Sequence, residues 1–181
     1  MFFKSDLFKY KQYSGKSSLV LIITTQGLWA IIVYRISNYI FKSKLPIIFK
    51  KPLLLIAVIF QKYIEIVTGI SIPYSCKIGH SFYIGHFGGI ILNANTVIGN
   101  NCNISQGVTI GVSGRGEKRG VPVIGNNTYI GANAVIAGKI VVGNNCTIAA
   151  NSLVIQSIEN NATVLGVPAK VINKLGSKSY I

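Results

Sequence analysis

From residue 72 onward, an aliphatic side chain returns at every sixth position of the chain. Two extra residues follow Ile90 and a longer interruption follows Ile110, but the same phase holds at thirteen positions: Ile72, Ile78, Ile84, Ile90, Ile98, Ile104, Ile110, Ile124, Ile130, Ile136, Val142, Ile148 and Val154. Neither an amphipathic helix nor an alternating strand keeps this spacing. A period of six is typical of hexapeptide β-helix repeats. The sequence therefore predicts a mainly β fold, a prism-like parallel β-helix over residues 71–158.

Small residues recur four positions after the aliphatic ones, at Cys76, Gly88, Ala94, Cys102, Thr128, Ala134, Cys146 and Ser152. All three cysteines of the chain belong to this set, and no CxxC pair occurs. We expect them to fill the inside of the coil as reduced thiols, which favours a cytoplasmic protein. Asn and Gly dominate the corners, because both tolerate left-handed backbone conformations.

The charge of the chain is one-sided, with 18 Lys or Arg against 4 Asp or Glu and 2 His. So few acids argue against catalysis by paired carboxylates. Two histidines and three cysteines argue against a protein-only metal site, and we expect no metal. A single histidine or a hydroxyl is left to carry any catalysis. No basic–aromatic motif points to nucleic acid.

The first 70 residues differ from the rest of the chain. They carry ten Lys or Arg against two acids, and their apolar residues recur at helical spacing. The apolar runs are too interrupted or too short for a membrane span. Two interpretations remain open: a helical cap packed on the β-helix, or a peripheral contact with the anionic inner face of the plasma membrane. We expect residues 159–181 to close the other end.

Five stretches resemble the left-handed β-helix acyltransferases of the hexapeptide-repeat type. They read YRISNYIF, IPYSCKIGHSFYIGHFGGIIL, ISQGVTIG, PVIGNNTYIGANAVIAG and LGVPAKVI, and together they span roughly residues 31–181. The chain is most similar to the serine acetyltransferase-like branch. A loop like GVSGRGEKRGVPVIG brings it closest to the sugar and polysaccharide O-acetyltransferases. The resemblance implies a left-handed coil, acetyl-CoA as co-substrate and a homotrimer.

His86 lies in the run GHFGG, at an outward position of its hexad, where glycines let a ligand approach the backbone. A neutral histidine suits the removal of a hydroxyl proton, although a solvated surface histidine fits the residues as well. The resemblance makes His86 the catalytic base. His80 is expected on an adjacent face, in a structural role. Gln106, one coil further on the same face as His86, either hydrogen-bonds the acceptor or continues a polar ladder.

The resemblance fails at several acceptor-side positions. Serine acetyltransferases carry an Asp fifteen residues before the catalytic histidine, where this chain has Ser71. We therefore expect Ser71 or a backbone carbonyl to orient His86. The histidine and arginine with which the family binds serine correspond to Val121 and Gly120, and Arg119 is one residue away.

These departures lead us to expect a sugar hydroxyl as the acceptor, in a surface polysaccharide or in a glycan or lipid-linked glycan precursor. One alternative is the serine O-acetyltransferase of cysteine biosynthesis. The other is a non-catalytic trimeric scaffold.

Residues 112–122, VSGRGEKRGVP, break the hexad phase and are expected to leave the coil as a loop. Arg115, Lys118 and Arg119 make this loop basic. Solvated loops often have such a composition. The alternative is a flap whose bases meet an anionic substrate over the site.

By the resemblance, coenzyme A lies in a groove between two prisms. The lining positions are then Ser113, Ala132 and Ala150, which are small enough for close approach. Lys170, in GVPAK, is placed to meet a phosphate. Routine coil packing explains each of these positions equally well.

Overall fold

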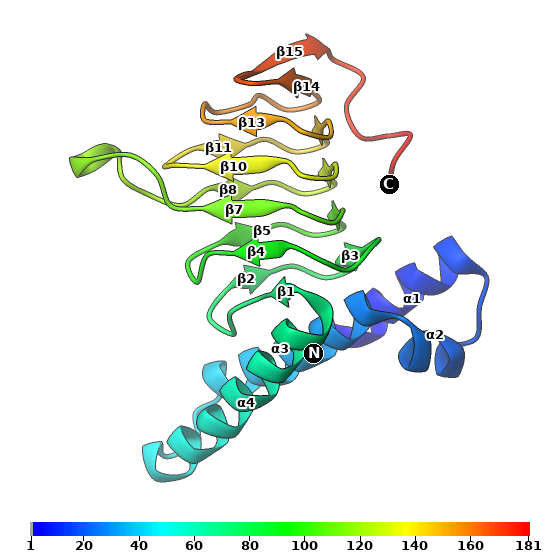
Figure 1. The fold of residues 1–181 in the computed structure, drawn as a ribbon, viewed down its shortest axis with the longest axis vertical. Helices are drawn as coiled ribbons and strands as arrows, with labels where there is room; N and C mark the ends of the chain where they lie inside the picture. The colour runs from blue at the N-terminus through cyan, green and yellow to red at the C-terminus, as the bar shows by residue number, and fades with distance from the viewer. Residues whose placement is uncertain (1) are drawn as a thin grey trace.

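The computed structural model describes residues 2–181, and in it a tall β-helix stands on a group of helices (Figure 1). The helices come first in the chain: α1 (Phe3–Ser14), α2 (Ser18–Thr24), α3 (Gln26–Lys42) and α4 (Ile47–Thr68). The fifteen strands that follow are two to five residues long. Each full coil consists of three of them.

The strands stack into three sheets, named here faces A, B and C. Face A contains β1 (Ile70–Ser71), β4 (Ile90–Leu92), β7 (Thr109–Gly111), β10 (Val135–Ala137) and β13 (Leu153–Val154). Face B contains β2 (Lys77–Ile78), β5 (Val97–Ile98), β8 (Val123–Ile124) and β11 (Val141–Val142). Face C contains β3 (Tyr83–Ile84), β6 (Asn103–Ile104), β9 (Tyr129–Ile130), β12 (Thr147–Ile148), β14 (Thr163–Gly166) and β15 (Ala169–Asn173). Every strand pair is parallel except β14–β15.

The hexad residues form the column of apolar side chains inside the prism. All thirteen predicted positions are buried, and none exposes more than 4% of its surface. The predicted parallel β-helix is therefore confirmed. Two small positions depart from the expectation, because Gly88 is only partly buried and Ala94 is exposed. The two extra residues after Ile90 lengthen that corner, so that Thr96 is the fully buried residue there.

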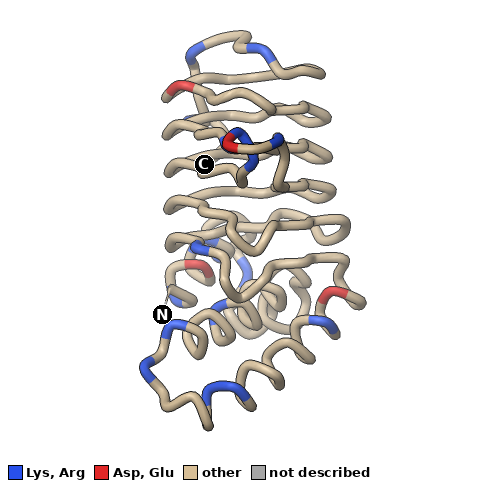
Figure 2. Tube along the Cα trace, turned by 90° about the vertical axis from the view of Figure 1, so that its left-hand side faces the viewer, with Lys and Arg blue, Asp and Glu red and all other residues tan. Residues whose placement is uncertain are grey.

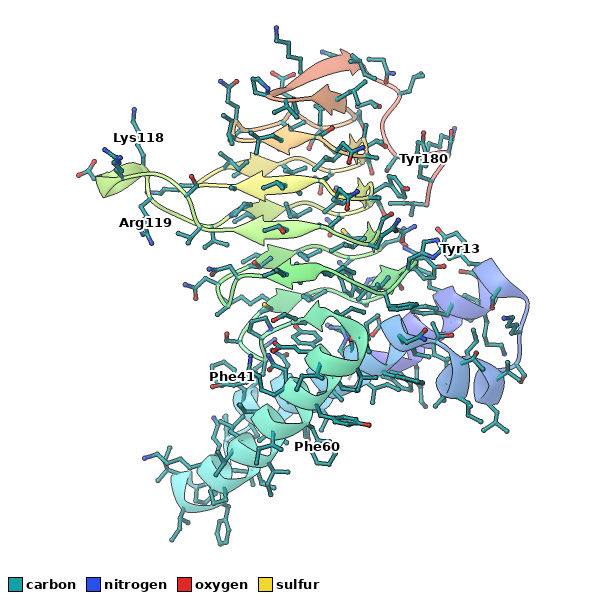
Figure 3. The ribbon with its side chains drawn as sticks, in the orientation of Figure 1. Tyr13, Phe41, Phe60, Lys118, Arg119 and Tyr180 are labelled. Carbon is teal, nitrogen blue, oxygen red and sulfur yellow. The ribbon has the colours of Figure 1, made fainter. Side chains whose placement is uncertain are left out.

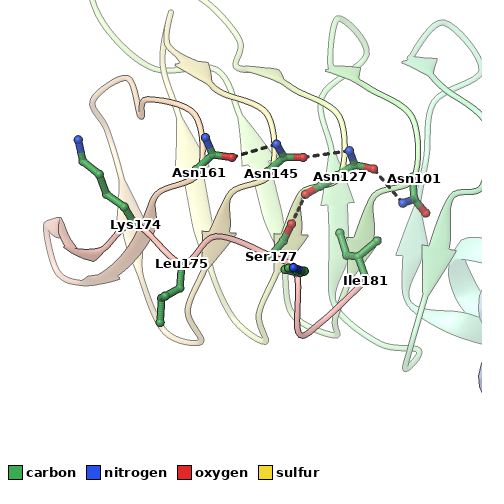
Figure 4. Close-up of a pocket in the computed structure, with 9 residues that line it drawn as sticks. Asn101, Asn127, Asn145, Asn161, Lys174, Leu175, Ser177 and Ile181 are labelled. Atoms are coloured by element: carbon green, nitrogen blue, oxygen red, sulfur yellow. Dashed lines mark hydrogen bonds between the residues drawn. The ribbon is translucent and has the colours of Figure 1, made fainter.

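The corner between faces B and C is built from asparagines in the left-handed backbone region. Asn101, Asn127, Asn145 and Asn161 all have φ between 51° and 62°. Their side-chain amides form one ladder, in which each Nδ2 donates to the Oδ1 of the next coil over 2.8–3.0 Å (Figure 4). These corners thus add hydrogen bonds between coils without a β-strand.

The lower edge of the first coil is capped by polar side chains of α1 and α3. Asp6 and Arg35 form a buried ion pair of 2.8 Å. Asp6 also accepts the backbone N–H of Phe82, and Arg35 donates to the carbonyls of Ile78 and Gly79. An open sheet edge leaves such groups unpaired and invites association, so this capping protects the coil.

Two tyrosines extend the same cap. The Tyr10 hydroxyl donates to the carbonyl of Ile84 and accepts its N–H, at 2.9 and 3.0 Å. The Tyr34 hydroxyl donates to the carbonyl of Cys76 and accepts the N–H of Ile78. Helices α1 and α3 therefore fit the cap interpretation of residues 1–70.

Helix α4 takes little part in this cap. Of its 22 residues, only Ala57 and Thr68 are buried, and its main neighbour is α3. Within residues 2–181 no single helix has the length and apolar character to cross a membrane. The pair α2 and α3, bent by 93° at its break, meets that test by length and composition.

The other end is closed by the antiparallel hairpin of β14 and β15, after which the chain runs back down the prism to Ile181 (Figure 1). The ring of Tyr180 stacks on Tyr129, with 4.6 Å between centroids. Ser177 donates its hydroxyl to the carbonyl of Asn127. A groove of about 400 Å³ lies between this segment and the asparagine ladder (Figure 4).

Candidate active site

The corner between faces C and A carries the candidate catalytic column. Along face C, β3, β6, β9 and β12 pair in register, each through one isoleucine. Residues two positions after those isoleucines therefore follow one another up this corner: His86, Gln106, Ala132 and Ala150. Neighbouring strands lie about 4.8 Å apart, so Gln106 is one step from His86. The structure thus aligns the predicted base, one predicted acceptor-side residue and two predicted cofactor residues along one corner.

The His86 side chain is exposed, in the turn between β3 and β4. No residue within 2–181 makes a hydrogen bond to its ring. Two glycines that follow it, Gly88 and Gly89, have φ of 99° and 67°, which only glycine adopts at low cost. A Cβ at Gly89 would approach the Gly107 Cα of the next coil to 3.3 Å. The GHFGG run therefore forms a turn whose glycines stack closely on the next coil, while the imidazole of His86 stays exposed.

Ser71 lies on face A beside Ile91 and hydrogen-bonds to a carboxylate from outside the β-helix. Its hydroxyl donates to Glu65 Oε1 over 2.5 Å. Glu65 also accepts from Gln61 and Lys62. Burial raises the pKa of Glu65, but the hydrogen bonds from Lys62, Ser71 and Gln61 outweigh this and hold the pKa below its usual value. The negatively charged carboxylate of Glu65 is therefore joined to Ser71 by one hydrogen bond.

Glu65 was missed by the sequence reasoning, which compared only the position of Ser71 itself. The carboxylate belongs to the last turn of α4, before the chain reverses at Gly69 with φ of 65°. Its only signal in the sequence is an acid placed six residues before Ser71, in a chain that contains four acids.

The basic loop leaves the prism on the other side of face A, between β7 and β8 (Figure 3). Ser113 and Gly120 close its neck with two backbone hydrogen bonds of 3.1 and 3.0 Å. Lys139 donates to the carbonyl of Glu117 inside the loop. Arg119 is exposed there. Within one chain, Arg119 and His86 therefore lie at opposite edges of face A.

The other two cofactor candidates, Ser113 near the loop and Lys170 on β15, lie apart from this column and border two adjoining grooves. Ser113 borders a groove of about 380 Å³ together with Lys118 and Lys139. Lys170 borders a second groove of about 330 Å³, and Ile155 lines both. The four predicted cofactor residues are thus divided, two in the column of His86 and two at these adjoining grooves.

His80 and the cysteines lie apart from this site. The His80 ring contacts Ser81 at 3.1 Å and Phe2, at the corner between faces B and C. Burial raises the pKa of Cys76 to about 12 and that of Cys102 to about 11, so neither is a thiolate at neutral pH. Within the part of the chain that the structure describes, no cluster of three His, Cys, Asp or Glu is arranged to hold a metal ion.

Comparison with known proteins identifies the family. The model of the bacterial transferase hexapeptide family (six repeats) matches residues 122–156. The serine acetyltransferase of Bacillus licheniformis is 32% identical over 183 residues, which covers 98% of this chain and 81% of that protein. The chain belongs to the serine acetyltransferase family of hexapeptide-repeat acyltransferases. The expected family of acyltransferases is therefore confirmed.

The family likeness extends to the three-dimensional structure. A serine acetyltransferase solved as a complex with CoA superposes with a TM-score of 0.79 at 28% identity, over 94% of this chain and 68% of that one. This agrees with the expected left-handed coil. The serine acetyltransferase of Synechococcus elongatus is 29% identical over 90% of this chain, and the chain spans 64% of its length.

The expected sugar or polysaccharide acceptor is wrong, and the expected glycan or lipid-linked glycan partner has no support. The matched relatives are named serine acetyltransferases, at about 30% identity over nine tenths or more of the chain. The expectation gave too much weight to Val121 and Gly120. Both lie at the end of the exposed loop, where side chains change without altering the prism that defines the family.

Proposed function

We propose that the chain is an acetyl-CoA-dependent serine O-acetyltransferase that serves cysteine biosynthesis. One observation carries the proposal: the 32% identity with a serine acetyltransferase extends over 98% of this chain. The exposed histidine on a glycine-rich corner supports it, because acetyl transfer to a hydroxyl needs a base with open access to the acceptor.

In this proposal His86 is the general base. Bound acetyl-CoA supplies the acetyl group as a thioester. His86 accepts the proton of the serine hydroxyl while that oxygen forms its bond to the acetyl carbon. As the carbon–sulfur bond breaks, His86 returns the proton to the departing thiolate, so the base is regenerated. Gln106 is the next residue of the same column, and we propose that it hydrogen-bonds the acceptor.

Ser71 and Glu65 are proposed to orient His86. A serine hydroxyl has one donor and two acceptor lone pairs. Because the donor is committed to Glu65, the lone pairs of Ser71 remain to accept an N–H of the imidazole. The carboxylate that other serine acetyltransferases place at this position is thereby supplied by α4 through one intervening hydroxyl.

The site is proposed to be completed between copies in a homotrimer. Ala132 and Ala150 present almost bare backbone further up the column of His86, which suits the close approach of a pantetheine arm. Lys118, Lys139 and Lys170 line the two adjoining grooves on the loop side of the prism and suit its phosphates. If the alanine column of one copy faced the lysine-lined grooves of another copy across an interface, both groups of residues would surround one ligand.

Arg119 is the proposed partner of the serine carboxylate. A guanidinium binds a carboxylate through two parallel hydrogen bonds. In the trimer this arginine would approach the His86 of a neighbouring copy, because its own His86 lies across face A. We place the enzyme in the cytoplasm, since its three cysteines are free and buried.

The proposal is tested by thiol release from acetyl-CoA with L-serine and, separately, with a panel of glycans. We expect saturable release with serine and none above background with glycans. Release with glycans alone would overturn the proposal. Absence of acetyl-CoA binding by calorimetry would instead favour the non-catalytic scaffold.

A further inference from the structure

The hairpin of α3 and α4 exposes an unusually large apolar surface. Along α4 the exposed apolar side chains are Ile47, Ile48, Phe49, Leu53, Leu55, Ile56, Ile59, Phe60, Tyr63, Ile66 and Val67. Monomeric soluble proteins rarely expose contiguous apolar patches beyond a few hundred Å², and larger ones mark interaction sites. The hairpin projects below the prism (Figure 3).

The far end of this hairpin, residues 41–51, is named here the tip. Its apolar side chains are well exposed: Leu45 by 44%, Ile47 by 65%, Ile48 by 72% and Phe49 by 63%. Four lysines flank them, at Lys42, Lys44, Lys50 and Lys51. Figure 2 shows this concentration of basic residues among the helices. The tip therefore combines exposed apolar groups with a purely positive charge.

No acid lies near enough in sequence to neutralise the tip. The two acids of the first 70 residues are Asp6 and Glu65, on either side of the hairpin. Asp6 is fully buried against Arg35, and Glu65 is engaged by Lys62 and Ser71 at the other end of α4. The four lysines thus give the tip a positive charge that neither acid neutralises.

An apolar groove continues from the tip between the two helices. It has a volume of about 380 Å³, and its main lining residues are Val33, Ile36, Ile40, Leu53, Ile56 and Phe60. Groove and tip together offer hydrocarbon contact along one side of the hairpin. The lysines concentrate at its end.

Two kinds of partner fit an apolar surface: a second copy of this chain, or a lipid surface. A second copy seated tip to tip would bring four more lysines and no acid, and like charges in apposition are repulsive. An anionic bilayer offers phosphates to the lysines and hydrocarbon to the isoleucines and phenylalanine. We propose that the tip docks the protein on an anionic phospholipid membrane, as a peripheral contact independent of acetyl transfer.

The first test is flotation of the full-length protein with vesicles. We expect binding to vesicles of phosphatidylcholine with phosphatidylglycerol at low salt, weak binding to phosphatidylcholine alone, and loss of binding as salt screens the lysines. Equal binding to both vesicle types, or none to either, would overturn the proposal.

A charge-matched pair of variants locates the contact. Lys44→Gln with Lys51→Gln removes two charges from the tip, and Lys16→Gln with Lys178→Gln removes two from elsewhere. Each lysine at an anionic surface contributes a factor of about five, so the tip variant should bind about twenty-five-fold more weakly. The control variant should keep most of its affinity. Similar losses in both variants would show only a general effect of net charge and would contradict a tip-specific contact.

Apolar variants separate a membrane from a second copy. Ile48→Ser with Phe49→Ser should reduce vesicle binding, whereas Ile172→Ser with Leu175→Ser should not. Sedimentation velocity without lipid should show the same oligomer for these two variants and for the two lysine variants. If the tip variants change the oligomer instead, the face is a contact between copies and the proposal fails. Acetyl transfer in lipid-free solution should persist in every variant, which separates this outcome from failure of the proposed function.

Discussion

At the scale of single residues, the proposed chemistry depends on side chains that lie far apart in the sequence. His86 belongs to a turn of the β-helix, whereas Glu65 belongs to the last turn of a helix. Ser71 lies between the two segments and holds the carboxylate through a hydrogen bond. The substitution of a family Asp by Ser71 is thus accompanied by a carboxylate from α4. This arrangement predicts separate effects for the base and for its positioning residues.

His86→Ala should lower kcat for acetyl transfer to serine by about a hundredfold to ten-thousandfold, because general-base catalysis typically contributes that much. The thiol-release assay measures the change. His80→Ala is the matched control, since this second histidine lies at another corner and should keep near-normal activity. Full activity in His86→Ala would show that the assignment of the base is wrong.

Glu65→Gln should lower kcat by about tenfold or more with little change in KM for serine, since misplaced catalytic groups lose rate rather than binding. Ser71→Asp in the Glu65→Gln background should restore kcat, because it returns a carboxylate to the orienting position. Circular dichroism and thermal melting follow folding in each variant. A merely structural role predicts lowered stability without this rescue.

At the scale of secondary-structure elements, the coil depends on close backbone contact at its corners. A Cβ built at Gly99 would lie 2.7 Å from the Asn126 nitrogen of the next coil. At Gly111 the nearest atom would be the Cγ2 of Thr109, at an ordinary 3.9 Å. The GNN corners are therefore set by the distance between coils as much as by backbone conformation.

Gly99→Ala should destabilise the protein by about 1–3 kcal/mol, the usual cost of overpacking a site that cannot relax. Gly111→Ala should stay within about 0.5 kcal/mol of the parent. Urea unfolding followed by circular dichroism measures both. Equal midpoints for the two variants would contradict the close stacking of this corner.

At the scale of the whole molecule, basic residues gather in two separate places, the hairpin tip and the basic loop. The lysines of the hairpin tip lie below the prism, whereas the basic loop projects from its side at the edge of face A (Figure 2). Because His86 and Arg119 occupy opposite edges of that face, the proposed site needs two copies. The oligomer is then part of the proposed catalytic unit.

Copies carrying His86→Ala and copies carrying Arg119→Ala should therefore complement each other. Each homotrimer alone should be weakly active. In randomly mixed trimers about a quarter of the interfaces would combine an intact His86 with an intact Arg119 and regain activity. Thiol release by the co-expressed, co-purified mixture measures this. A mixture no more active than its parents would place both residues in a site within one chain.

The sequence by itself determined the coil, its buried column and the outward place of His86. These features follow from a period of six, and a period is a local property that each hexad repeats. Only the tertiary structure decided which helix supplies Glu65, which edge of face A carries Arg119, and that α1 and α3 cap the prism while most of α4 stays exposed. Such contacts join segments that do not share the six-residue repeat, so no local pattern in the sequence predicts them. The acceptor was misjudged for the same reason, because loop residues were compared before their surroundings were known.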